Sequence, residues 1–190
     1  MLRAGDGPVS TWSVPNLISF ARIALVPVFV VVLAVGAHDV AGRWWATALF
    51  VVAISTDSLD GHLARSRNLV TDLGKILDPI ADKALTGAAL VVLSALGELP
   101  WWVTLPILVR EVGITVYRFA VLSKRVIPAS KGGKTKTVLQ SVAIALAIAP
   151  LPALLGSWVN GVNAVVMGLA FVVTIVTGVQ YLVDDRRMNR

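Results

Sequence analysis

The sequence predicts an all-α membrane protein with six transmembrane helices. Hydrophobic residues make up 56% of the 190 residues and charged residues only 15%, whereas soluble domains are typically about 45–50% apolar and about 25% charged. The apolar residues also fall into long runs, each close to the ~20 residues that a helix needs to cross a bilayer. The chain contains no cysteine, which excludes a disulfide framework and any Cys-ligated metal or redox site.

The apolar runs have recognisable ends. Short breaks at 97–100 and 156–157 contain glycine, and Ser13 with Pro15 is typical of a helix N-cap and first turn. Tryptophans lie near several run ends, as amphipathic rings do at membrane interfaces. No linker or repeat divides the chain, so we expect a single domain over 1–190, with 1–14 as a short N-terminal cytoplasmic segment. The expected spans are 15–37, 42–63, 75–97, 100–123, 134–156 and 158–183.

The basic residues predict the orientation. If the N-terminus is cytoplasmic, only Arg43 faces outward among the basic residues that flank the spans. This bias follows the positive-inside rule and places both termini in the cytoplasm, in what we expect to be a bacterial plasma membrane. It also explains the net charge of +6 without nucleic-acid binding. The basic residues on the cytoplasmic side are Arg3, Arg65, Arg67, Lys75, Lys124, Arg125, Lys131, Lys134, Lys136, Arg186, Arg187 and Arg190.

Four aspartates lie where charges are costly, inside the second and third spans. Asp57 and Asp60 are three residues apart, and Asp78 and Asp82 are four apart, so each pair shares one helix face. The two spans form an antiparallel hairpin, because only a short polar segment joins them. Both pairs are therefore expected at one depth, just inside the cytoplasmic surface, where they line a polar cavity.

Four converging carboxylates repel one another unless cations neutralise them. Mg²⁺ or Mn²⁺ prefers carboxylate oxygens, and this set suits two ions that clamp a phosphoryl group. Small residues nearby leave room for a ligand, and Arg65 lies at the lip, where it suits a phosphate. The alternative is that the acids pair internally with Arg65, Lys75 and Lys83.

Residues 57–82 read D-S-L-D-G-H-L-A-R, eight further residues, then G-K-I-L-D-P-I-A-D. This pattern resembles the signature of the CDP-alcohol phosphotransferase family, D-x2-D-G-x2-A-R-x8-G-x3-D-x3-D. Six spans around a cytoplasmic site are also similar to the family's architecture, so the resemblance covers essentially the whole chain. The matching positions are Asp57, Asp60, Gly61, Ala64, Arg65, Gly74, Asp78 and Asp82.

The resemblance implies a metal-dependent enzyme that uses CDP-diacylglycerol as donor and forms a homodimer. Asp57, Asp60 and Asp78 are then metal ligands, while Asp82 is both a ligand and the general base. The base takes a proton from the acceptor hydroxyl, which attacks the phosphorus bearing the diacylglycerol, and CMP leaves. The residues implied in donor binding are Asp57, Asp60, Gly61, Ala64, Arg65, Gly74 and Asp78.

Basic residues in the fourth and fifth spans favour an acceptor alcohol that carries its own phosphate. These are Arg110, Arg118, Lys134 and Lys136. The alternative is structural: Arg110 pairs with Glu111 or Asp82, and the two lysines anchor the fifth span.

Four stretches resemble the phosphatidylglycerophosphate synthases within the family. That resemblance implies glycerol 3-phosphate as acceptor and phosphatidylglycerophosphate as product, with Asn16 and Arg22 in the cavity wall and Thr135 at its rim. Ser19 departs from the subgroup, where threonine is expected. Inositol phosphate and phosphatidylglycerol remain alternative acceptors. The stretches are P-N-L-I-S-F-A-R at 15–22, D-P-I-A-D-K at 78–83, R-E-V-G-I-T at 110–115 and G-K-T-K-T-V-L-Q at 133–140.

Acids inside a membrane also mark ion pathways, so a divalent-cation transporter is the alternative from a different functional class. Transport favours acids near the bilayer midplane and a route to both faces. Here the acids gather at one face, and the outer half of the spans lacks charge apart from Glu98 near its end. This placement favours the enzyme.

Overall fold

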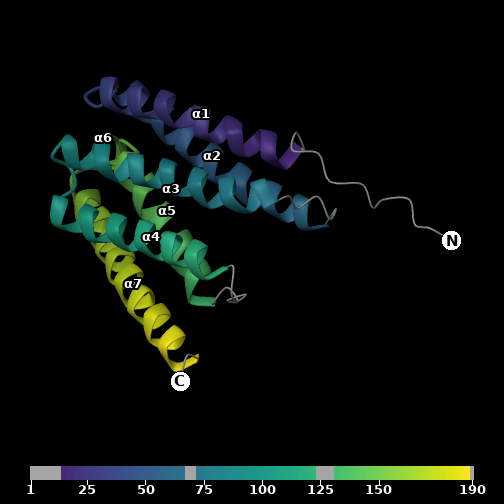
Figure 1. Ribbon diagram of the computed structural model, residues 1–190. Coiled ribbons are helices and arrows are strands. Elements are labelled where there is room, and N and C mark those ends of the chain that lie inside the picture. Colours follow the sequence, from purple (N-terminus) through teal and green to yellow (C-terminus); the bar gives the residue numbers. More distant parts are fainter. Residues whose placement is uncertain (1–13, 67–71, 123–130, 189–190) are drawn as a thin grey trace.

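The computed structural model describes residues 14–66, 72–122 and 131–188 (Figure 1). Within these ranges every regular element is an α-helix, which confirms the all-α prediction. The helices are α1 (Val14–Val35), α2 (Val40–Ser66), α3 (Asp72–Ala95), α4 (Trp101–Leu122), α5 (Lys131–Ile148), α6 (Leu151–Leu155) and α7 (Trp158–Met188).

The fifth expected span is the one that the structure corrects. The run 134–156 was predicted as one helix, but α5 ends at Ile148 and a short α6 follows. Pro150 explains the break, because it has no amide hydrogen to donate and it disfavours helical backbone in the residue before it. The predicted breaks at 97–100 and 156–157 are confirmed, and Gly97 and Gly156 have φ angles of 76° and 97°, which favour glycine. Ser13 lies outside the described residues.

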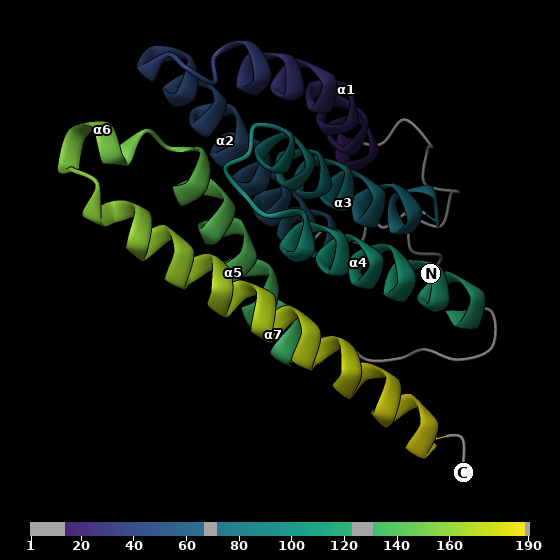
Figure 2. The same cartoon turned by 90° about the vertical axis from the view of Figure 1, so that its left-hand side faces the viewer.

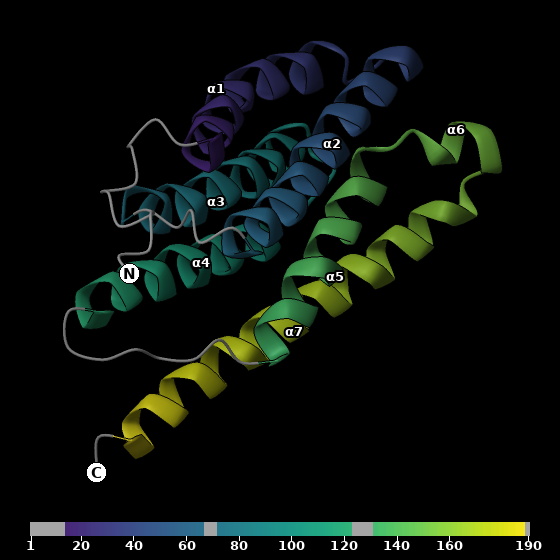
Figure 3. The same cartoon turned by 90° about the vertical axis from the view of Figure 1, so that its right-hand side faces the viewer.

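The helices pack along one another, and the three connections that the structure describes lie at one end (Figures 1, 2 and 3). α1 packs against α2 and α3, α4 against α3 and α7, and α5 against α7. The core contains Phe29 and Phe50, whose ring centroids are 5.7 Å apart. We call the end formed by 36–39, 96–100 and 149–157 the connection end. The opposite end, which contains the last turns of α2 and the first turns of α3, is the motif end.

The α1–α2 connection is tight because glycines meet there. A Cβ atom on Gly36 would lie 2.8 Å from the Gly42 Cα atom, which is closer than real Cβ contacts. Asp39 caps α2, since its Oδ2 accepts a hydrogen bond of 2.8 Å from the Gly42 amide. The turn therefore fixes the start of α2 and the position of Arg43 one residue further.

Two helical segments of the described chain are long and apolar enough to cross a membrane, Leu17–Val35 and Trp158–Asp184. α3 and α4 carry charged residues near their middles or ends, which lowers their hydropathy. Even so, large apolar side chains such as Val109 on α4 are mostly exposed. Such exposure is unfavourable in water and favourable against lipid.

Candidate active site

The four aspartates of the pattern lie on two neighbouring helices toward the motif end. Asp57 and Asp60 lie in the last turns of α2, while Asp78 and Asp82 lie in the first half of α3. The side chains of Asp78 and Asp82 are described. Several other predicted site residues have side chains that the structure does not describe: Asn16, Asp57, Asp60, Ala64, Arg65, Arg118 and Lys134. The surroundings of Gly61 and Gly74 are likewise outside the described part.

Asp78 is held from the first helix. The buried Ser19 of α1 donates a hydrogen bond of 2.5 Å from its Oγ to Asp78 Oδ1. Asp78 itself is exposed. Ser19 stands where the sequence comparison predicted threonine, and its hydroxyl provides the contact that either residue could make. This contact was not predicted, because nothing in the sequence pairs residues that are 59 positions apart.

Asp82 is held by its neighbour. Lys83 Nζ lies 3.1 Å from Asp82 Oδ2, and the Thr86 hydroxyl donates to the Asp82 carbonyl oxygen at 2.9 Å. The internal pairing of acids with Lys83, considered above as an alternative, therefore exists for this aspartate. Both side chains of this pair are partly exposed, however, and the contact involves Oδ2 of Asp82.

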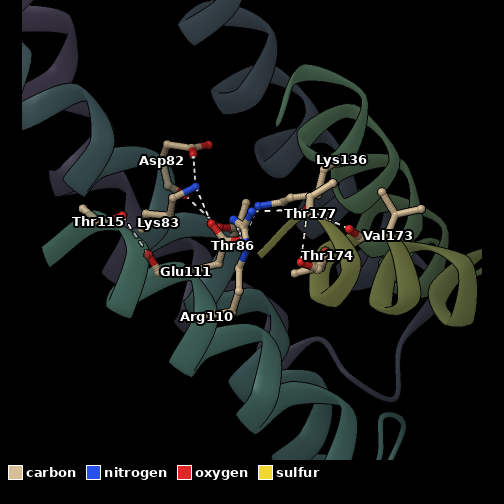
Figure 4. A network of polar contacts seen from close by, with 10 residues as sticks. All are labelled: Asp82, Lys83, Thr86, Arg110, Glu111, Thr115, Lys136, Val173, Thr174 and Thr177. Carbon is tan, nitrogen blue, oxygen red and sulfur yellow. Dashed lines mark hydrogen bonds and ion pairs between the residues drawn. The ribbon is translucent and has the colours of Figure 1, made fainter. Parts of the chain in front are cut away.

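Glu111 is the centre of a larger polar network, which we call the Glu111 cluster: Asp82, Lys83, Arg110, Glu111 and Lys136 (Figure 4). Its Oε2 atom lies 2.6 Å from Lys83 Nζ, and its Oε1 atom lies 3.0 Å from Arg110 Nη1 and also accepts from Lys136 Nζ. The side chains of Glu111 and Lys136 are only 5% and 3% exposed. One buried carboxylate thus joins α3, α4 and α5.

Arg110 extends the cluster to the last helix. Its Nη2 atom donates to Thr177 Oγ1 at 3.2 Å. Gly178 makes room for the arginine, because a Cβ atom there would lie 2.9 Å from Arg110 Cγ. The Arg110 Nε atom is buried and has no hydrogen-bond partner among the described residues. Both Arg110 and Lys136, predicted to hold the acceptor phosphate, therefore converge here, and the predicted alternative pair of Arg110 with Glu111 is present.

The charges of the Glu111 cluster do not balance. Three cationic side chains, Lys83, Arg110 and Lys136, meet two carboxylates, Asp82 and Glu111. Buried charge is costly unless it is compensated. The excess of one positive charge favours an additional anion at this place. Of the other residues assigned to the cavity, Arg22 is buried on α1 and Thr135 is exposed at the start of α5.

Among the side chains described, acids and histidines form no group of three that could hold a metal ion. The predicted metal ligands include Asp57 and Asp60, whose side chains are outside the described part of the chain. The two described members fit a hard cation by their chemistry, because both are carboxylates and they stand one helical turn apart on α3. Among the described residues, the hydrogen-bond partner of Asp78 is the Ser19 hydroxyl.

Comparisons with known proteins identify the family. The family model described as CDP-alcohol phosphatidyltransferase matches residues 12–176. A protein named probable phosphatidylglycerophosphate synthase from Mycobacterium tuberculosis (strain H37Rv) is 48% identical over 168 residues, which are 88% of this chain and 78% of the relative. A CDP-diacylglycerol–glycerol-3-phosphate 3-phosphatidyltransferase from Bacillus subtilis (strain 168) is 37% identical over 90% of this chain and 93% of its own length. This chain belongs to the CDP-alcohol phosphatidyltransferase family.

Proposed function

We propose that the protein transfers a phosphatidyl group from CDP-diacylglycerol to glycerol 3-phosphate, forming phosphatidylglycerophosphate and CMP. Relatives that are 37% and 48% identical carry names for this activity. The observation that carries the proposal within this chain is the Glu111 cluster, whose excess positive charge lies next to Asp82. An acceptor that bears a phosphate matches this excess, whereas a neutral alcohol does not.

We further propose that six helices span a bacterial plasma membrane, with α6 as a short segment at the connection end. The motif end and both termini then face the cytoplasm. Support comes from the basic residues near that end and from exposed tryptophans at the other, such as Trp45 and Trp102. The proposal treats 1–190 as one domain. A homodimer is included on the family resemblance alone.

The metal part of the proposal rests on the four aspartates. Asp57, Asp60, Asp78 and Asp82 would hold two Mg²⁺ or Mn²⁺ ions. Bound there, the ions would neutralise charge on the donor's pyrophosphate. Ser19 contributes by fixing one oxygen of Asp78 through its hydrogen bond, so that the carboxylate is oriented before the donor binds. Gly61, Ala64, Arg65 and Gly74 are proposed to accommodate the cytidine and phosphate end.

Asp82 is proposed as the general base. It takes the proton from the acceptor hydroxyl, whose oxygen forms a bond to the phosphorus that bears the diacylglycerol. The bond from that phosphorus to the oxygen of CMP breaks, and CMP leaves with the electron pair. The ammonium of Lys83 lies 3.1 Å from Asp82 Oδ2 and helps to hold the carboxylate in position.

The acceptor phosphate is assigned to Arg110, Arg118, Lys134 and Lys136. Glu111 contacts two of these and orients them from the buried side. The unpartnered Nε atom of Arg110 is a further donor in the same place. Glu111 also separates like charges, since Lys83 and Lys136 bind different oxygens of one carboxylate.

The test is CMP release by the purified protein with CDP-diacylglycerol and Mg²⁺, comparing glycerol 3-phosphate, inositol phosphate and phosphatidylglycerol as acceptors. We expect release with glycerol 3-phosphate only. Release with another acceptor instead would retain the reaction type but overturn the assignment of the cationic residues. No release with any of the three, from folded and metal-loaded protein, would favour the cation transporter considered from the sequence.

A further inference from the structure

A cavity lies at the connection end, away from the motif aspartates. Its volume is about 640 Å³, within the roughly 300–1,000 Å³ that small-molecule sites occupy. Residues from all three connections and from α7 form its wall, at the end where α6 lies in Figures 1 and 3. Much of the wall is apolar, including Leu93, Leu99, Val103, Ala147 and Met167.

Three charged residues line this cavity: Asp39, Arg43 and Glu98. Arg43 Nη2 donates to Glu98 Oε2, while the Arg43 Nη1 atom is buried without a hydrogen-bond partner among the described residues. Asn163 also lines the cavity; its Nδ2 donates to the Leu146 carbonyl oxygen at 3.1 Å, and its Oδ1 is buried and similarly unpartnered. One cationic donor and one acceptor are therefore left unsatisfied, which is unfavourable for buried polar atoms.

The exposed tryptophans place this cavity at the level of lipid headgroups. Trp45, Trp101, Trp102 and Trp158 are all about half exposed or more, and each lies near a helix terminus at the connection end. Trp102 is also part of the cavity wall. Amphipathic indole rings prefer the boundary between hydrocarbon and headgroups. An apolar cavity with charged residues at that boundary matches an amphiphile.

We propose that this cavity binds a phospholipid with a primary ammonium headgroup, of the phosphatidylethanolamine type, from the leaflet at the connection end. The phosphate accepts from Arg43 Nη1, and the ammonium donates to Asn163 Oδ1 beside the carboxylates of Asp39 and Glu98. An acyl chain covers the apolar wall, which offers water few partners.

The charges favour this headgroup over an anionic one. Asp39, Arg43 and Glu98 together carry one negative charge, so a lipid with a net negative charge would add to it, while a zwitterionic lipid presents both signs. Free phosphate would leave the apolar wall uncovered. The site is separate from the proposed donor and acceptor sites, which lie at the motif end.

The test uses photoactivatable lipids with a diazirine on the acyl chain, in phosphatidylcholine nanodiscs that contain the full-length protein. Matched ethanolamine and glycerol headgroup probes are compared, and labelled peptides are located by mass spectrometry. We expect the ethanolamine probe to label 99–103 and 164–168 about tenfold more than the glycerol probe, which corresponds to one charge-assisted contact.

Two glycines of α7 supply a matched pair of variants. Gly168 lines the cavity and Gly161 does not, and an added Cβ meets no atom within 4 Å at either position. Gly168→Leu is expected to reduce labelling at 99–103 about tenfold, whereas Gly161→Leu leaves it unchanged. CMP release by both variants shows that the protein is folded and that the proposed reaction is unaffected.

Two results would overturn the proposal. One is equal labelling by the two headgroup probes. The other is labelling that spreads along the helices and that Gly168→Leu does not change, which would identify the bound molecules as ordinary surrounding lipid.

Discussion

The two ends of the molecule each contain a glutamate that binds cationic side chains, but the two are built differently. Glu111 at the motif end binds Lys83, Arg110 and Lys136, and its side chain is 5% exposed. Among the described residues, Glu98 at the connection end forms an ion pair only with Arg43, and its side chain is 35% exposed. The first arrangement leaves an excess of positive charge around a buried acid, while the second is a single pair near the surface.

This difference indicates how strongly each ion pair affects stability and the proposed reaction. A single, partly exposed pair adds little to stability. Where three cations surround one buried acid, the positive charge that the acid does not neutralise destabilises the fold unless another anion or water compensates it. We therefore expect substitutions at the motif end to affect turnover and stability strongly, and matched substitutions at the connection end to affect them weakly.

The largest difference is expected between Asp82→Asn and Asp39→Asn. Loss of the general base should lower turnover by about 10²–10⁴-fold, while binding of CDP-diacylglycerol is largely retained. Asparagine caps a helix as well as aspartate does, so Asp39→Asn should keep wild-type turnover. Steady-state CMP release measures both. Wild-type turnover by Asp82→Asn would remove that residue from the role of base.

Metal removal should affect the proposed reaction at the motif end but not lipid binding at the connection end. Chelation with EDTA is expected to abolish CMP release, and added Mg²⁺ or Mn²⁺ to restore it, because the proposed ions neutralise the donor's pyrophosphate. Labelling of the connection-end cavity by the ethanolamine lipid should not change. CMP release that persists in EDTA would contradict the metal assignment.

Glu111→Gln and Glu98→Gln make the same chemical change at the two ends. Glu111→Gln leaves three cations around a neutral amide, and we expect the free energy of unfolding to fall by about 3 kcal/mol or more. Glu98→Gln should change it by less than about 1 kcal/mol, because its pair is partly exposed. Unfolding in detergent measures both variants. Equal destabilisation would remove the distinction between the ends.

The smallest effect is expected at Ser19. Ser19→Ala removes the hydroxyl that donates to Asp78, so we expect turnover to fall about tenfold, the usual scale for one hydrogen bond to a charged group. Ser19→Thr retains a hydroxyl and should keep most of the activity. The contact with Asp78 has no functional role if the alanine and threonine variants turn over equally.

Much of the fold could be predicted from the sequence because each long helix is an apolar run with visible ends. The glycines at 97 and 156 and the charged residues that flank the runs mark those ends directly. Pro150 was missed, although it ends α5, because the alanine- and leucine-rich residues around it continue the apolar run. Composition detects an apolar run, whereas a continuous helix also requires the residues of its interior to have an amide hydrogen that they can donate.

The candidate site was predictable only in part. Aspartates that are three or four residues apart on one helix reveal a shared face, and the family pattern identified them together. Glu111 could be considered as a partner of Arg110 from the sequence, but sequence spacing cannot show that Lys83 and Lys136 approach it from two other helices. The same limit applies to the connection-end cavity, whose wall combines residues from all three connections.

The most direct measurement of the proposed activity follows the acceptor rather than the donor. Purified protein is incubated with CDP-diacylglycerol, Mg²⁺ and radiolabelled glycerol 3-phosphate, and the lipid phase is extracted. We expect the label to enter the lipid phase as phosphatidylglycerophosphate, in equal amount to the CMP released. Release of CMP while all label stays in the aqueous phase would show that glycerol 3-phosphate is not the acceptor, and would contradict the proposed function.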